Sequence, residues 1–359
     1  MRILATYRIA AAEAESRARA EALAAEQSVE MPVAAIDDPR VREEIVATVE
    51  SIRPQAGRFD VTLGIAPATT GHEASQLMNM LFGNCSLQPE VELVDVKFPE
   101  GYERAFGGPR FGIEGIRTLA GVAGRPLTCT ALKPQGSPVG HLAKLAHTFA
   151  LAGIDVIKDD HGLANQAFSP FDERVPAVQR AIDAANQEMG GRTIYAPTFS
   201  GAPAALRDQA RIARECGVRM ALVAPMLVGI PSFVELQAAL DIPVLAHPAF
   251  AGSVRIAPPL LLGKLFRLFG ADATIFPNHG GRFSFSPETC RRIANCARSA
   301  WQGVRPALPV PAGGMTVERV PEMLASYGTD VMLLIGGGLL SAKEQLPGRS
   351  REFVAAVKG

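Results

Sequence analysis

The sequence lacks the features of a secreted, membrane-spanning or nucleic-acid-binding protein. Its five cysteines are odd in number and form no C-x-x-C pair, which argues against a disulfide framework or a thiolate zinc site. Lysine plus arginine equals aspartate plus glutamate at 36 each, so the basic field of a nucleic-acid-binding protein is missing. No apolar run approaches the roughly 18 residues of a membrane helix, and the first ten residues alternate like a strand, unlike a signal peptide. We expect a cytoplasmic protein that binds neither membrane nor nucleic acid.

Residues 1–108 have the pattern of predicted strands and helices that is typical of a small α+β domain. Alternating apolar residues predict strands, and segments rich in Ala, Glu and Arg or with an apolar stripe predict helices. The expected strands are Ile3–Ile9, Phe59–Ile65 and Val91–Phe98, and the expected helices are Ala10–Glu26 and His72–Phe82. Residues 27–57 give a weaker pattern, and we expect a loop or strand and a short helix there. The order predicts an N-terminal α+β domain of ferredoxin-like type.

Residues 109–359 repeat a strand-like run followed by an amphipathic segment. The eight apolar runs are Leu127–Leu132, Ile154–Ile157, Thr193–Ala196, Met220–Val223, Val244–Ala246, Ala273–Phe276, Leu308–Pro311 and Val331–Leu334. Strands that alternate with helices indicate a parallel sheet. Eight units over this length favour a closed (β/α)8 TIM barrel as the C-terminal catalytic domain, with an open doubly wound sheet as the alternative.

Ionisable residues and glycines gather just after these predicted strands. Active sites of such barrels lie in the loops that follow the strands, so this gathering at one rim indicates an enzyme. The residues in question are Lys133 after the first run, Lys158 to His161 after the second, His247 after the fifth, His279 after the sixth, Gly313 and Gly314 after the seventh, and Gly337 and Gly338 after the eighth.

The last two loops are candidates for phosphate binding. Glycine lets backbone N–H groups approach an anion closely, and these loops commonly hold phosphate in this fold. The alternative is that the glycines only form tight turns.

The segment IKDDHG supplies candidate catalytic and metal-binding groups. A lysine can act as a base, and a carboxylate and an imidazole can bind a metal, so Lys158, Asp160 and His161 form a candidate site. A simple ion pair is the alternative.

Lys133 could remove a proton next to a carbonyl or stabilise an enolate. His247 and His279 could bind substrate oxygens or move protons.

Several segments together resemble the RuBisCO superfamily. They are FGGPRFGIEGIRTLAGVAGRPLTCTALKPQG and GIDVIKDDHGLANQAFSPFDER, followed in the family's order by LAHP, NHGG, PAGG and IGGG, and preceded by LFGN. The resemblance covers nearly the whole chain and is best between Asn84 and Phe171.

The resemblance implies a role for each matching position. Lys158 matches a lysine that is carbamylated by CO2 and binds Mg2+, and Asp160 matches a metal-binding aspartate. Lys133 matches a lysine that assists enolisation. The resemblance further implies active-site roles for His247 and His279, and phosphate-binding backbone at Gly313, Gly314, Gly337 and Gly338. It also implies that Asn84, and less surely Glu26, serve the neighbouring subunit's site in a homodimer.

The departures from the family pattern indicate a RuBisCO-like protein without carboxylase activity. His161 replaces a metal-binding glutamate, which leaves both the identity of the metal and carbamylation open. Gln135 replaces a second lysine, and Pro248 replaces an arginine that holds the second phosphate of a bisphosphate. The loop after the sixth strand lacks a mobile lysine, and Arg282 is the residue there that could supply a charge.

We therefore expect metal-assisted enolisation or isomerisation of a monophosphorylated sugar derivative, such as a methylthio-sugar phosphate of methionine salvage. The base would be Lys133 or the Lys158 carbamate. One alternative is a decarboxylase or a transcarboxylase/hydrolase that acts on a 3-oxo sugar-acid phosphate. Another is a catalytically silent binding or regulatory protein.

Overall fold

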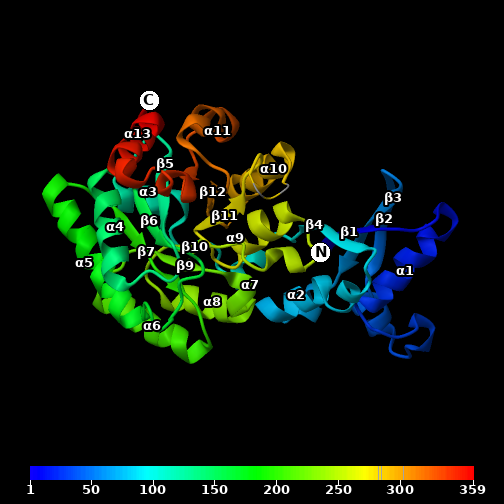
Figure 1. Cartoon of the computed structure of the whole chain (residues 1–359). Coiled ribbons are helices and arrows are strands. Elements are labelled where there is room, and N and C mark those ends of the chain that lie inside the picture. The colour runs from blue at the N-terminus through cyan, green and yellow to red at the C-terminus, as the bar shows by residue number, and fades with distance from the viewer. Residues whose placement is uncertain (282, 284, 302) are drawn as a thin grey trace. The chain divides into compact units, whose positions relative to one another are not determined.

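The computed structural model describes residues 1–281, 283, 285–301 and 303–359, so Arg282 lies outside the described residues. The chain divides into two compact units (Figure 1). The first comprises Met1–Gly107 and Ala251–Leu261, and the second comprises Gly108–Phe250 and Leu262–Gly359. In the first unit the segment 251–261 joins the sheet region through two backbone hydrogen bonds with Leu93, one from Leu93 N to Arg255 O and one from Ala257 N to Leu93 O. No helix in the described part of the chain is long and apolar enough to cross a membrane.

The first unit is a β-α-β-β-α-β arrangement built on one antiparallel sheet of order β2-β3-β1-β4. Its elements are β1 (Ile3–Ile9), α1 (Ser16–Glu26), β2 (Thr48–Gln55), β3 (Arg58–Ile65), α2 (Ala74–Phe82) and β4 (Val91–Lys97). Alternate residues of β1 are fully buried, which is the period expected of a strand with helices over one face. The ferredoxin-like order confirms the expected class of this part. The strand β2 lies in the segment for which the sequence pattern was weak.

The second unit is a parallel barrel, and it confirms the predicted TIM-barrel class. Its described strands follow the order β7-β6-β5-β13-β12-β11-β10-β9-β8. They are β5 (Leu127–Leu132), β6 (Val156–Asp159), β7 (Ile194–Ala196), β8 (Thr198–Phe199), β9 (Ala221–Val223), β10 (Val244–Ala246), β11 (Ala273–Pro277), β12 (Leu308–Ala312) and β13 (Met332–Leu334). The predicted third strand, Thr193–Ala196, corresponds to β7, and a further short strand, β8, follows it after Pro197.

Helices alternate with the barrel strands, as amphipathic segments predict. They are α3 (Gly112–Ala120), α4 (Val139–Leu151), α5 (Phe171–Met189), α6 (Pro203–Glu215), α7 (Pro225–Val228), α8 (Ile230–Ala239), α9 (Phe266–Leu268), α10 (Pro287–Arg298), α11 (Val320–Tyr327), α12 (Gly337–Leu340) and α13 (Leu346–Lys358). A π-helix, η8 (Pro259–Leu265), leads into α9, and a short 3-10 turn, η9 (Val317–Arg319), leads into α11.

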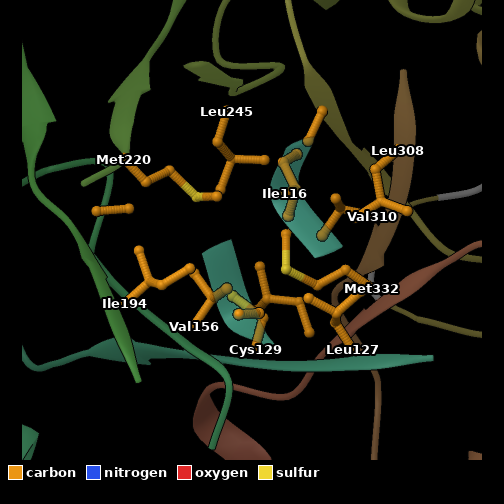
Figure 2. Close-up of a cluster of buried hydrophobic side chains, with 14 of the residues drawn as sticks. Ile116, Leu127, Cys129, Val156, Ile194, Met220, Leu245, Leu308, Val310 and Met332 are labelled. Atoms are coloured by element: carbon orange, nitrogen blue, oxygen red, sulfur yellow. The ribbon is translucent and has the colours of Figure 1, made fainter. Parts of the chain in front are cut away.

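The barrel interior is filled by side chains that recur at every second position of the strands. Figure 2 shows this cluster, in which Val156 of β6, Cys129 of β5 and Leu245 of β10 meet residues of the other strands and of α3. Because side chains alternate along a strand, the next inward positions after these three residues lie nearer the carboxyl end of the barrel. Those positions are Lys158, Ala131 followed by Lys133, and His247. The hydrophobic filling therefore continues directly into a polar layer.

Candidate active site

The polar layer centres on Asp160, which directly follows β6. Its Oδ1 lies 2.6 Å from the Lys133 ammonium and 3.2 Å from Nδ1 of His161. The Asp160 side chain is 12% exposed and that of Lys133 is 32% exposed, so this ion pair is reachable from solvent. Two strands supply the pair, because Leu132 at the end of β5 is in register with Asp159 at the end of β6.

The ionisation of Asp160 is strongly favoured by its neighbours. Burial opposes ionisation of the carboxyl group, but hydrogen bonds from His161 and Lys133 outweigh it, and the lysine charges act in the same direction. The pKa of Asp160 consequently lies far below its ordinary value. This carboxylate is available as an anionic ligand or counter-ion throughout the physiological pH range.

Lys158 is the buried member of the group. Its side chain is nearly inaccessible, and the Nζ donates a hydrogen bond of 2.8 Å to the main-chain oxygen of Asp159. Burial is the largest influence on its pKa and lowers it, and the Lys133 charge lowers it further, while Cys129 and Asp160 act in the opposite direction. The amine of Lys158 thus loses its proton more readily than an exposed lysine, and the neutral amine is the nucleophilic form.

Two imidazoles stack at the side of this group. The rings of His161 and His247 lie with centroids 4.4 Å apart and planes 7° from parallel. Nδ1 of His247 accepts a hydrogen bond from the Ala249 amide, which fixes the ring and leaves Nε2 for another partner. Burial, followed by the charges of Lys158 and His161, lowers the pKa of His247 to about 2. His247 is therefore a neutral imidazole.

The predicted phosphate loops follow neighbouring strands at the same end of the barrel. Gly313 and Gly314 follow β12, and Gly337 and Gly338 follow β13 and are exposed. A Cβ placed on Gly336, just before them, would lie 3.7 Å from Cε of Lys133. Because Lys133 passes this close to the end of β13, the β13 loop and the Asp160 group adjoin one another.

His279 is held in a different set of contacts from the other predicted site residues. Its Nε2 lies 2.8 Å from Oε1 of Glu322 on α11, and its buried Nδ1 has no hydrogen-bond partner among the described residues. The sequence interpretation singled out His279 but not Glu322, because neither hydrophobic pattern nor strand position marks a residue in the first turn of a helix.

Asn84 lies in the first unit, where it begins the short 3-10 turn η5 (Asn84–Leu87). Its Nδ2 donates a hydrogen bond of 2.9 Å to Oε1 of Glu26 at the end of α1. The two residues that the family resemblance pairs are thus neighbours within this unit.

A buried charge network next to the site was missed by the sequence interpretation. Asp159 is fully buried and accepts hydrogen bonds from Arg174 of α5 at 3.1 Å and from the Tyr195 hydroxyl at 2.8 Å. The IKDDHG motif drew attention to Asp160 rather than to its neighbour, although strand alternation places the two carboxylates on opposite faces of the chain.

Comparisons with known proteins show the family to which the chain belongs. Residues 112–273 match the model of the ribulose bisphosphate carboxylase large chain, catalytic domain. A ribulose bisphosphate carboxylase-like protein 1 from Rhodopseudomonas palustris is 54% identical over 358 residues, covering 99% of this chain and 97% of that protein. The chain belongs to the RuBisCO-like protein family.

Two further relatives refine the comparison for this RuBisCO-like protein. A 5-methylthioribulose-1-phosphate isomerase from Rhodospirillum rubrum is 50% identical over 361 residues, covering 100% of this chain and 96% of that enzyme. A crystal structure of a Rubisco-like protein from Rhodopseudomonas palustris superposes with a TM-score of 0.93 at 50% identity, covering 99% of this chain and 97% of that one.

The donor atoms of the RuBisCO-like site bear on whether it fits a divalent metal. Among the described residues, no group of three His, Cys, Asp or Glu side chains converges as a ready metal site. Asp160 and His161 supply two donors, and an ammonium at Lys158 would repel a cation. A carbamate on the buried Lys158 would reverse that charge and add two oxygen ligands. The residues therefore fit a metal when Lys158 is carbamylated.

Proposed function

We propose that this RuBisCO-like protein is a metal-assisted isomerase of a monophosphorylated sugar derivative, 5-methylthioribulose 1-phosphate or a close analogue, and that it does not fix CO2. The observation that carries the proposal is the cluster in which Lys133, Asp160 and Lys158 from two neighbouring strands meet beside a neutral imidazole. The 50% identity to an isomerase of this class over the full chain supports the choice of substrate.

The chemistry follows from the charges in the cluster. An isomerisation next to a carbonyl requires a base that removes a proton and a positive environment for the oxygen that gains charge. Lys133, as an amine, is positioned to take the proton, and as an ammonium it stabilises the oxygen. The Lys158 carbamate is the alternative base. His247 stays neutral and so can donate or accept a hydrogen bond to a substrate hydroxyl without adding charge.

A divalent cation, Mg2+ in the first instance, would be held by Asp160 and the carbamate of Lys158, with His161 as a further ligand. When bound, it would polarise the carbonyl and stabilise the negative charge that forms as the proton leaves. The protein's own contribution is to keep Asp160 ionised through its contacts with Lys133 and His161, and to exclude water around Lys158 by burying it.

The phosphate of the substrate would lie against the main-chain amides of the loops after β12 and β13, where Gly313, Gly314, Gly337 and Gly338 leave the backbone uncovered. These two loops together would form one anion-binding region, which suits one phosphate group. A proline at position 248, directly after His247, offers no charge for a second phosphate. A monophosphate is therefore the better substrate than a bisphosphate.

The function is tested by incubating the purified protein, Mg2+ and bicarbonate with 5-methylthioribulose 1-phosphate and following the reaction by proton and phosphorus NMR. We expect an isomeric sugar phosphate to form, with no incorporation of labelled CO2 from ribulose 1,5-bisphosphate. Release of CO2 from a 3-oxo sugar-acid phosphate, or metal-dependent binding without turnover of any sugar phosphate, would contradict the proposal.

Carbamylation has its own readout. With 13C-labelled bicarbonate and Mg2+ we expect a carbamate resonance in the wild-type protein that is missing in Lys158→Arg. A matched Lys144→Arg change on the exposed side of α4 should retain the signal. A signal that survives in Lys158→Arg would show that another amine carries the carbamate.

The proposed homodimer with composite sites is tested by complementation. Asn84→Ala and Lys133→Ala should each abolish turnover alone, because each removes a group from every site of a homodimer. Mixed dimers should recover part of the activity, since one site of the pair then contains both native residues. A monomer by light scattering, or no recovery after exchange of subunits, would contradict this arrangement.

A further inference from the structure

One arginine in the barrel unit joins two loops that follow different strands. Arg319 ends η9 and contacts the turn after β12 and the turn after β11 at once. Its Nη1 donates to the main-chain oxygen of Gly314 at 3.1 Å, and its Nη2 donates to the main-chain oxygen of His279 at 3.1 Å. A guanidinium group can do this because its donors are fixed in a plane and point in several directions.

The same guanidinium is held in place by a carboxylate one turn further along the chain. Arg319 Nε and Nη2 donate to the two oxygens of Glu322 at 3.0 and 3.1 Å, which is a two-point contact. Oε1 of Glu322 also lies 2.8 Å from Nε2 of His279. Arg319 thus binds the main chain of His279, and Glu322 binds its side chain.

The two loops held in this way touch backbone to backbone. A Cβ on Gly314 would lie 2.3 Å from Cα of Gly281, and a Cβ on Gly281 would lie 2.7 Å from the oxygen of Gly313. The space is thus too small for any side chain. A Cβ on Gly280 would lie 3.2 Å from the Arg319 guanidinium, so the arginine lies directly on the turn. A small movement of Arg319 would therefore shift both turns.

The ion pair of Arg319 and Glu322 is expected to contribute little to the stability of the fold. The Glu322 side chain is 50% exposed, and ion pairs with such exposure contribute little to folding. Meanwhile Nδ1 of His279, in the ring that Glu322 holds, is a buried polar atom with no partner among the described residues. Buried polar atoms usually have a hydrogen-bond partner, so this one is free to bind a group outside the chain.

We propose that Arg319 and Glu322 are positioning residues that set the shape of the phosphate-binding turn after β12 by holding it against the turn after β11. The inference rests on the proposed function in one respect, because it takes the turn after β12 as part of the site of the substrate's phosphate. The pair acts through the main chain of Gly314 and His279 and does not itself touch the reacting atoms.

The experiment measures two quantities on the full-length chain. The first is the affinity for inorganic phosphate by calorimetry, and the second is KM and kcat for 5-methylthioribulose 1-phosphate. For Arg319→Met we expect phosphate affinity to fall and KM to rise about 10-fold or more, with kcat changed less, because the turns bind substrate and transition state alike. Glu322→Gln should give a smaller change in the same direction, since its amide retains one hydrogen bond.

Two further variants separate positioning from charge and from general damage. Arg319→Lys keeps the charge but cannot span the two carbonyls, so we expect it to resemble Arg319→Met. Arg349→Met is the matched control, because Arg349 forms comparable pairs with Glu318 and Glu352 and has no hydrogen bond or ion pair with the described residues of the turns. It should leave phosphate affinity, KM and kcat at the wild-type values, and all variants should melt within a few degrees of the wild type.

Calorimetry distinguishes a failure of this inference from a failure of the proposed function. If the wild type binds phosphate but turns over no sugar phosphate, a loss of phosphate affinity in Arg319→Met still supports the pair's role. Wild-type phosphate affinity in Arg319→Met, full activity in Arg319→Lys, or no phosphate binding by the wild type would each overturn it.

Discussion

Two neighbouring aspartates at the end of β6, Asp159 and Asp160, point to opposite faces of the strand and have opposite surroundings. Asp159 points outward to α5, is completely buried, and has each carboxylate oxygen occupied by Arg174, Tyr195 or the amide of Thr198. Asp160 points inward, is partly exposed, and binds Lys133 and His161 at the rim. A buried carboxylate with all its hydrogen bonds made fixes the structure, whereas a partly exposed carboxylate with a partly exposed ammonium partner is available for chemistry.

The largest expected effect tests the inward face. Asp160→Asn removes the anion that anchors Lys133 and, by our proposal, the metal. We expect kcat/KM to fall by about 10³-fold or more, measured with 5-methylthioribulose 1-phosphate at saturating Mg2+. Asp172→Asn in the exposed first turn of α5 is the matched control. Near-wild-type turnover in Asp160→Asn would remove this carboxylate from the site.

The next effect tests the outward face. Arg174→Met leaves Asp159 buried without its cation, and breaking such a pair costs about 3–5 kcal/mol of unfolding free energy. Chemical denaturation followed by circular dichroism should report this loss, while the activity of the protein that remains folded changes only a few-fold. Arg211→Met, which breaks an exposed pair with Glu215 on α6, should change stability by less than about 0.5 kcal/mol. Equal losses in both variants would contradict the contrast between the two faces.

The barrel and the inward-facing group of Lys133, Lys158 and His247 could be predicted from the sequence for a common physical reason. Lys133, Lys158 and His247 continue the two-residue period of the buried strand residues, so their convergence follows from strand alternation in a parallel barrel. The contacts of Asp159 with Arg174 and of His279 with Glu322 join strands to helices. Such contacts depend on helix rotation and on loop paths, which periodicity does not determine.

A smaller effect concerns the neutral imidazole of the inward face. Because the pKa of His247 is about 2 in the folded chain and near 6.5 when unfolded, the unfolded state takes up a proton first as the pH falls. This contribution to stability is complete above pH 6.5 and is lost progressively below it. His247→Gln should therefore lose less thermal stability between pH 7 and pH 5 than the wild type. The exposed His141→Gln on α4 should follow the wild type, and an identical fall in all three would show that His247 ionises in the folded protein.

The smallest effect concerns Cys129, which lies in the buried barrel interior below Lys158. Burial raises the pKa of the Cys129 thiol to about 12, so its thiolate fraction stays below about 1% even at pH 9.5. Mass spectrometry after treatment of the native protein with iodoacetamide should find the partly exposed Cys216 modified and Cys129 intact. Both should react once the chain is unfolded. Modification of native Cys129 at the rate of Cys216 would mean that the barrel interior below Lys158 is open to solvent.

The most direct test of the inward group is solvent exchange. In deuterium oxide, we expect the wild-type protein to exchange the carbon-bound proton next to the carbonyl of 5-methylthioribulose 1-phosphate. Lys133→Ala should slow this exchange by about 10²-fold or more, while the exposed Lys144→Ala should not alter it. Exchange at the wild-type rate in Lys133→Ala would contradict the claim that the lysine paired with Asp160 serves the reaction.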